Sequence, residues 1–346
     1  MSSKLLKPGW KMVKFGDVVR QCKEKVDRDD NPFERYVEGG HMDSENIHIK
    51  RWGEFGQDYV GPAFHRIFRK GQVLYGSRRT YLKKVAYAEF DGITANTTFV
   101  CETKDPGIFL QELLPFLMLT DKFTEHSIRE SKGSTNPYIN WGDIGKYEFP
   151  LPPIDEQKRI AEILWAADEA VEDWRRVLAY MDIMISVSRI EFFSRRNWPK
   201  KKLKNLFSVQ LGKMLSPKAK KGNSSFPYLA NYNIQWDRID LEKVQEMGFS
   251  SNEREKFALV PGDILVCEGG EVGRSAIWHG EIENCYYQKA LHRLRSLSDF
   301  SSEIMVQFMM WADRKGLFKA LTGHSTIAHL TAIKLKEMEV PVPSGK

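Results

Sequence analysis

The sequence predicts an α+β protein in which two similar domains, each a curved, mostly antiparallel sheet plus a helix, are joined by one long coiled-coil-type helix. Three observations predict this architecture: a sequence repeat between the two halves, short strand-like runs within each half, and a heptad pattern between them. The chain has 346 residues, enough for two domains of roughly 100–200 residues each. The expected boundaries are 1–152 for the first domain, 153–197 for the helix, 198–343 for the second domain and 344–346 for the truncated start of a distal region.

The repeat has a nearly constant offset. Residues 71–74 (GQVL) match residues 262–265 (GDIL), 191 positions later, and residues 148–152 (EFPLP) match residues 339–343 (EVPVP) at the same offset. Trp10 near the start of the first half corresponds to Trp198 near the start of the second. Because a solenoid needs at least three stacked repeats, two copies indicate a tandem duplication of a globular domain.

Within each copy, runs rich in Val, Ile, Tyr and Phe alternate with turns that contain Gly and Asn, which is typical of short strands. The expected strands are 72–75, 84–88 and 97–101 in the first copy, and 263–266, 274–278 and 291–294 in the second. Each copy also has one expected helix, at 109–123 and at 303–317.

After Pro153 the apolar residues alternate by four and three, which is a heptad seam sustained over more than four heptads. Prolines 152 and 153 start the expected helix, and Asp155 and Glu156 favour its N-terminal end. A helix of ~42 residues would be about 60 Å long. An ordinary core helix can show such a stripe, but rarely one this long, so we expect a partner helix or another subunit to cover it. The seam residues are Ile160, Leu164, Val171, Trp174, Leu178, Met181 and Ile185.

Composition excludes several classes of protein. No apolar run approaches the ~18 residues of a membrane span, and the N-terminus lacks the layout of a signal peptide, so we expect a cytoplasmic location and no membrane partner. The four cysteines lie far apart and are expected to be reduced, and no Cys/His group has the spacing of a metal site. The net charge of +6 is modest, but basic residues cluster in both halves, which favours phosphate contacts.

The motifs of nucleic-acid enzymes are incomplete. An adenine methylase needs a D/N-P-P-Y/F loop, and residues 31–33 (NPF) and 136–138 (NPY) both lack the second proline. No phosphate-binding G-x-x-x-x-G-K-[ST] loop is present. A nuclease centred on Asp263 and Glu268 would want a lysine where Gly270 stands. The sequence therefore predicts a protein that is not an enzyme.

Residues 149–160 (FPLPPIDEQKRI) are similar to the signature that opens the conserved helix in specificity subunits of Type I restriction-modification systems. The 133–135 loop (GST) and the duplicated layout fit the same family. The resemblance implies two target-recognition domains that each read one half of a split double-stranded DNA target, with the helix fixing their separation. It also implies partners: modification subunits that bind S-adenosylmethionine and methylate adenine, and a motor subunit that cuts DNA. No cofactor is expected in this chain.

The sequence departs from the family pattern at its end. A full-length member has a second conserved helix after the second recognition domain, whereas only residues 344–346 follow Pro343 here. We therefore expect either a shortened chain or a first helix that pairs with a second copy or with a helix of a partner. This departure motivates an alternative function, an assembly or decoy protein that binds modification subunits without useful sequence recognition.

Specificity for DNA comes from side chains that reach base edges: arginine suits guanine, and asparagine or glutamine suits adenine. The candidate DNA-binding residues lie on turns, where Gly, Ser and Asn are also favoured for purely structural reasons. Because the candidate loops differ between the halves, we expect an asymmetric target, although its sequence cannot be read from these residues. The candidates are Arg78, Arg79, Tyr81, Lys83, Lys132, Ser134, Thr135, Asn136 and Tyr138 in the first domain, and Asn231, Tyr232, Asn233, Arg274, His324, Ser325 and Thr326 in the second.

Overall fold

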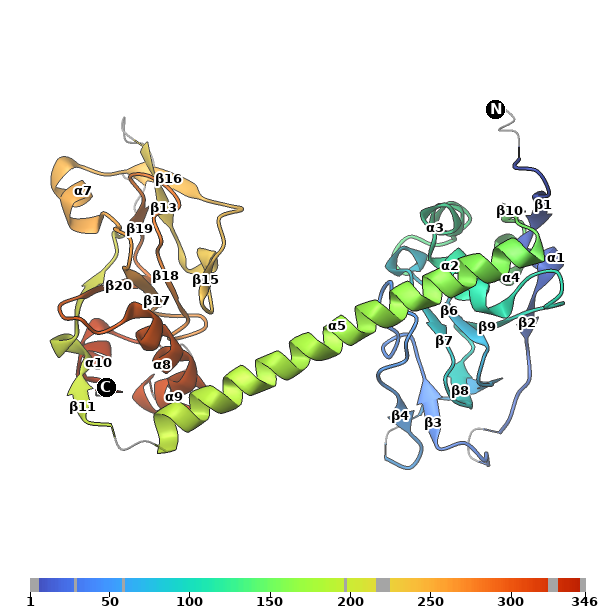
Figure 1. Ribbon diagram of the computed structural model, residues 1–346, viewed down its shortest axis with the longest axis horizontal. Coiled ribbons are helices and arrows are strands. Elements are labelled where there is room, and N and C mark those ends of the chain that lie inside the picture. Colours follow the sequence, from blue (N-terminus) through green and yellow to red (C-terminus); the bar gives the residue numbers. More distant parts are fainter. Residues whose placement is uncertain are drawn as a thin grey trace. The chain divides into compact units, whose positions relative to one another are not determined.

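The computed structural model describes residues 6–27, 30–57, 60–195, 198–215, 225–322 and 329–342. The chain divides into two compact units, Met1–Arg175 and Arg176–Lys346. The long helix α5 (Ile154–Arg195), green in Figure 1, begins in the first unit and ends in the second. Its 42 residues match the length expected from the heptad pattern.

The first unit contains two four-stranded sheets, with strand orders β2-β9-β6-β7 and β4-β3-β8-β5, and a separate pair β1-β10. All pairings are antiparallel except that of β3 with β8, which is parallel. The strands are β1 (Lys11–Lys14), β2 (Val19–Cys22), β3 (Arg35–Val37), β4 (Gly53–Glu54), β5 (Phe64–Phe68), β6 (Val73–Gly76), β7 (Val85–Tyr87), β8 (Gly92–Ala95), β9 (Thr98–Thr103) and β10 (Glu148–Leu151). The helices before α5 are α1 (Phe15–Val18), η1 (Thr80–Leu82), η2 (Gln111–Leu113), α2 (Leu114–Leu119), α3 (Asp121–Arg129) and α4 (Trp141–Ile144).

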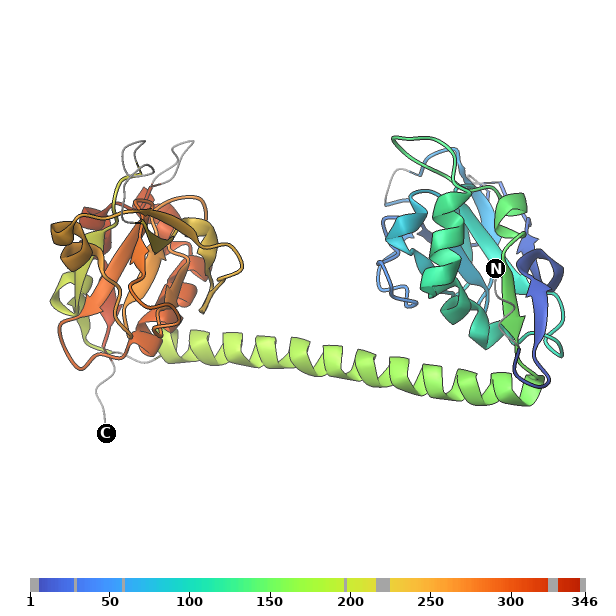
Figure 2. The same cartoon turned by 90° about the horizontal axis from the view of Figure 1, so that it is seen from above.

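The helical region of the first unit differs from the single helix expected at 109–123. The chain forms η2 and α2, breaks at Thr120 and continues as α3 to Arg129. Thr120 has extended backbone angles, and its hydroxyl accepts a hydrogen bond from the Phe123 amide, so it is the N-cap of α3. In Figure 2 these helices, coloured teal to green, lie on one side of the blue strands of the same unit.

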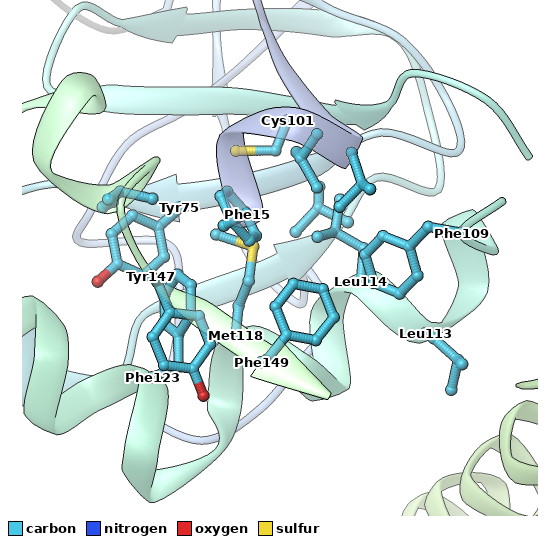
Figure 3. Close-up of a cluster of buried hydrophobic side chains, with 14 of the residues drawn as sticks. Phe15, Tyr75, Cys101, Phe109, Leu113, Leu114, Met118, Phe123, Tyr147 and Phe149 are labelled. Atoms are coloured by element: carbon cyan, nitrogen blue, oxygen red, sulfur yellow. The ribbon is translucent and has the colours of Figure 1, made fainter. Parts of the chain in front are cut away.

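The main core of the first unit lies between these helices and the β2-β9-β6-β7 sheet. Phe15 is fully buried, and its ring lies 5.3 Å from that of Phe123 and 5.9 Å from that of Trp141. Figure 3 shows Phe15 at the centre of the cluster, with Tyr75 from the sheet and Met118 and Phe123 from the helices around it. Burial of these aromatic side chains joins the N-terminal residues to both helices.

The second unit repeats this topology. Its four-stranded sheet has the order β12-β20-β17-β18, the counterpart of β2-β9-β6-β7, and the parallel pair β13–β19 is the counterpart of β3–β8. The strands are β11 (Lys200–Lys202), β12 (Phe207–Leu211), β13 (Ser225–Leu229), β14 (Ile234–Gln235), β15 (Arg238–Ile239), β16 (Gln245–Gly248), β17 (Ile264–Cys267), β18 (Ser275–Ile277), β19 (Tyr286–Tyr287), β20 (Leu291–Ser296) and β21 (Glu339–Pro341). The helices after α5 are η3 (Leu203–Asn205), η4 (Asn231–Asn233), α7 (Ser251–Phe257), α8 (Ser302–Arg314), α9 (Leu317–Thr322) and α10 (Ala332–Glu337). The helix expected at 303–317 is thus α8, with α9 following a turn at Gly316.

The repeated G-[QD] turn has the same geometry in both units. Gly71 and Gly262 have positive φ angles of 89° and 92°, a backbone conformation that favours glycine. The side chain of Gln72 accepts a hydrogen bond from the Arg69 amide, and Asp263 accepts one from Val260 in the equivalent place. The turn that feeds β6 and the turn that feeds β17 are therefore copies of one structure, which confirms the duplication.

The seam of α5 has two different environments. Ile160 and Leu164 are half-buried against the core of the first unit, so their assignment to a partner-helix seam is corrected: the first unit itself covers them. Val171, Trp174 and Leu178 are 47%, 68% and 59% exposed, and Met181 and Ile185 are 51% and 50% exposed. The five residues from Val171 to Ile185 therefore form a large exposed apolar surface, which we call the open seam.

A cluster of charged residues fixes α5 to the first unit. His48 lies between Glu89 and Asp168 of α5, with nitrogen-to-oxygen distances of 2.8 and 2.7 Å. Next to it, Lys50 pairs with Glu172 of α5 at 2.7 Å. Burial lowers the pKa of His48, but its hydrogen bonds to the two carboxylates outweigh burial, and the net shift is upward.

The raised pKa gives this contact a defined pH dependence. His48 is expected to stabilise the folded chain fully below its unfolded pKa of about 6.5, and the contribution is lost as the pH rises through the higher folded pKa. The melting temperature of the wild type should therefore exceed that of His48→Gln at pH 5.5, and the difference should shrink at pH 8.5. An equal difference at both pH values would contradict the assignment.

Candidate nucleic-acid interface

Two loops of the first unit that are far apart in sequence lie against each other. The Arg79 amide donates to the Pro137 carbonyl at 2.7 Å, and the Ile139 amide donates to the Ser77 carbonyl at 2.9 Å. Lys132 and Tyr138 exchange two backbone hydrogen bonds that close the second loop at its base. Residues 77–81 and 132–138 therefore form one continuous surface, which we call the paired-loop surface.

Most of the candidate residues of the first domain are exposed together on this surface. Arg78, Arg79, Ser134, Thr135 and Asn136 are exposed, and the two tyrosines, Tyr81 and Tyr138, are 52% and 41% exposed. The Arg78 guanidinium carbon lies 6.0 Å from the centre of the Tyr138 ring. Arginine, amide, hydroxyl and aromatic groups gathered on one surface are the side chains that hydrogen-bond to base edges and phosphates.

Lys83 is a correction to the candidate set. Its ammonium group lies 2.7 Å from both Glu45 and Asp121, and its side chain is only 19% exposed. Because two carboxylates already neutralise it, Lys83 holds the end of η1 in place and offers no free charge. Lys132 is more exposed but also pairs with Asp143 at 3.2 Å. Hydrogen bonds from Lys146 and Lys132 lower the pKa of Asp143 to about 2, so it stays ionised at neutral pH.

Two candidates in the second unit are also corrected, because they have internal partners. Asn233 is 1% exposed; its carbonyl oxygen accepts from the Ala230 amide, and its side-chain amide donates to the carbonyls of Asp240 and Lys243. Arg274 donates to Glu271 and to the Asn231 carbonyl, both at 2.9 Å. Both side chains stabilise the turn at η4 instead of facing solvent.

Tyr232 and Asn231 remain candidates, since Tyr232 is 42% exposed and Asn231 is half-buried beside it. The other candidates of this domain, His324, Ser325 and Thr326, lie outside the described residues. The lysines at the start of the second unit are paired with carboxylates: Lys202 and Lys204 both bind Glu337 at 2.5 Å, and Lys200 lies 3.4 Å from Glu339.

The structural role of Asn233 leads to a prediction. Asn233→Ala removes three buried hydrogen bonds and is expected to destabilise the second unit by about 1–3 kcal/mol. Asn231→Ala is the matched control two residues earlier in η4, and we expect a change within about 0.5 kcal/mol. Urea unfolding of both variants measures the difference, and equal stabilities would place Asn233 back among the candidates for ligand contact.

One surface feature carried no signal in the sequence. The Arg35 guanidinium stacks on Trp52 and Phe90, with distances of 4.4 and 5.1 Å to the ring centres. The three residues come from separate segments that only the β4-β3-β8-β5 sheet brings together. Because these residues are far apart in the sequence, no local motif predicts their contact.

Asp263, one of the two acidic residues considered for a nuclease, has a structural role. Asp263 is 1% exposed and accepts two hydrogen bonds from Arg295, both at 2.7 Å. Within the described ranges no group of three or more His, Cys, Asp or Glu residues is arranged to hold a metal ion. In the same part of the chain, no helix combines the length and the hydropathy that a membrane span requires.

The duplicated α+β units, the long helix with its open seam and the paired-loop surface define a class: two-domain proteins with the features of nucleic-acid recognition. Comparison with known protein families identifies one family that matches both units. Residues 7–175 and 195–346 match the Type I restriction modification DNA specificity domain, and the chain belongs to this family.

Individual relatives agree with this membership. The EcoDI specificity subunit of a Type I restriction enzyme from Escherichia coli is 28% identical over 166 residues, which are 47% of this chain and 36% of that relative's length. The chain thus matches well under two thirds of this relative. A solved structure concerning complex assembly and conformational transition of the type I R-M system has a TM-score of 0.61 at 20% identity, covering 98% of this chain and 87% of the other. The S subunit of the Type I system from M. genitalium has a TM-score of 0.58 at 13% identity, covering 98% and 86%. At these identities the solved structures support the two-domain fold.

Proposed function

We propose that this chain is the sequence-specific DNA-binding subunit of a Type I restriction-modification complex. In this proposal each domain reads one half of a split, asymmetric target, and modification subunits that methylate adenine at N6 dock on the chain. S-adenosylmethionine binds to those partners, a separate motor subunit joins the full restriction complex, and the chain itself carries out no catalytic step. The expected location is the cytoplasm.

The observation that carries this proposal is that the exposed residues of the paired-loop surface differ from the residues at the equivalent positions of the second unit. At the repeat offset, Gly269 and Gly270 stand where the first unit has Arg78 and Arg79, while Arg274 corresponds to Lys83. Both Lys83 and Arg274 are held by carboxylates. The scaffold is thus the same, but the exposed chemistry differs, which supports two different half-sites.

The exposed apolar side chains of the open seam support the proposal that a protein partner binds to α5. Five large apolar side chains on one stretch of helix are unfavourable in water, and burial against another helix would remove them from it. A helix of a modification subunit or of a second copy has the required chemistry.

The experiment is methylation mapping by long-read sequencing of DNA from cells that express the chain with its cognate modification subunit. The expected result is a split, asymmetric motif with methyladenine on both strands. A palindromic motif would mean that one domain is used twice through pairing in trans. Absence of methylation, where the same modification subunit is active beside another specificity subunit, would contradict the proposal.

The alternative is an assembly protein without useful sequence recognition, and the size of the open seam favours partner binding in either case. Sequence-independent DNA binding with a steep salt dependence and intact partner binding would favour this alternative. Methyl transfer from S-adenosylmethionine by the isolated chain would contradict a non-catalytic role.

A further inference from the structure

The two arginines of the paired-loop surface differ from the basic residues around them. Lys83 and Lys132 are engaged by carboxylates, and Lys146 shares Asp143 with Lys132. Among the described residues, neither the Arg78 nor the Arg79 side chain has a hydrogen bond or an ion pair. Their charges are therefore the ones that this surface leaves available for a ligand.

The backbone around Arg78 is fixed before any ligand binds. Arg79 has a φ angle of 49°, an unfavourable conformation for a residue with a side chain. The hydrogen bond from its amide to Pro137 holds it there, so the second loop sustains the strain. Strained backbone of this kind is concentrated at binding sites, where it positions a side chain.

The side chain of Arg78 has an aromatic neighbour. Its guanidinium carbon lies 6.0 Å from the centre of the Tyr138 ring, within the range of a cation–π contact, which favours some orientations of the group over others. A planar guanidinium that is already oriented loses little conformational entropy on forming two parallel hydrogen bonds. The edge of guanine in the major groove, with its O6 and N7 acceptors, is the base that matches such a fork.

From this geometry we propose that Arg78 determines specificity by reading a guanine in the half-site bound by the first domain, and that Tyr138 is its positioning residue. The inference rests on the proposed DNA-binding function. Asn136 is exposed two residues before Tyr138 on the same loop. Its side-chain amide has the donor and acceptor that pair with adenine. A phosphate contact by Arg78 would not need the neighbouring tyrosine.

The test uses the chain in complex with its modification subunit and compares wild type, Arg78→Gln and Tyr138→Leu. Methylation mapping of cells that express each complex identifies the motif. Binding to duplexes that carry each base at every position of the motif measures discrimination. Arg78→Gln is expected to lower the preference for guanine at one position of one half-site by about 10- to 100-fold. Tyr138→Leu should lower the preference for guanine at the same position by a smaller factor. In both variants the base preferences at the other half-site should be unchanged.

Arg51→Gln is the matched control, because it removes an exposed guanidinium of the same unit that pairs with Asp43 outside the paired-loop surface. This variant should keep the wild-type motif. A uniform loss of affinity for all sequences in Arg78→Gln, with an unchanged motif and a salt slope reduced by about 1, would make Arg78 a phosphate contact and overturn the inference. That result would leave the proposed function intact. A wild-type complex without any sequence preference would instead overturn both.

Discussion

A chain in which Trp174 and Leu178 are both replaced by aspartate is expected to stay folded but to bind the proposed helical partner much more weakly. The two side chains are 68% and 59% exposed in the isolated chain, so their replacement removes little from either domain core. In an assembled complex they would lie at the centre of the interface, and two buried carboxylates without partners cost several kcal/mol. The affinity for the modification subunit, or for a second copy, should fall by roughly 100-fold or more.

Co-purification and analytical ultracentrifugation measure this loss. The matched control is Lys158→Asp, which changes the net charge by the same two units on the side of α5 opposite to the open seam, as given by 3.6 residues per turn. Lys158 is exposed, and its ion pair with Asp155 is long, at 3.8 Å. Unchanged assembly of the double variant would exclude the open seam as an interface.

The second large effect is expected for Phe15→Ala. Phe15 is fully buried among Phe123, Trp141 and the sheet residues of Figure 3, and its truncation leaves a cavity in the main core of the first unit. Loss of a buried phenyl ring destabilises a protein by about 3–5 kcal/mol. Met12→Ala is the matched control three residues earlier, where the side chain is 51% exposed and a change within about 0.5 kcal/mol is expected.

Hydrogen exchange resolves the effect by unit. The amides of β6 in the first unit should lose protection in Phe15→Ala, while those of β17, its counterpart in the second unit, should keep it. Equal loss in both strands would mean that the two units unfold together, and no loss in β6 would show that the Phe15 cavity is relieved by repacking.

Local sequence patterns predicted the architecture well. Strand-like runs at 72–75 and 263–266 became β6 and β17, and the heptad pattern became the 42-residue helix α5. The G-[QD] repeat identified the turns whose glycines have positive φ. These features depend on periodicity and turn chemistry within a few residues, so they can be read along the chain.

The parallel pairs were not predictable in the same way. Residues 35–37 include the strand-favouring Tyr36 and Val37 but form too short a run to reveal their partner, because β3 pairs with β8 more than 50 residues later. The break at Thr120 was also missed, because one threonine within an apolar helical pattern does not reveal that it will act as an N-cap.

For the candidate site, the amino-acid sequence identifies which loops carry arginine, asparagine and tyrosine, and it shows that these loops differ between the two copies. Which of these side chains remain available for a ligand depends on how the chain folds. Lys83 is neutralised by Glu45 and Asp121, each 38 residues away, and Asn233 is buried by hydrogen bonds to its own turn. The same holds for α5, where the first core covers Ile160 and Leu164 but leaves Trp174 open. The physical reason is that ion pairing and burial depend on distances in space between segments that are remote in sequence, whereas the residue types that could bind DNA are local.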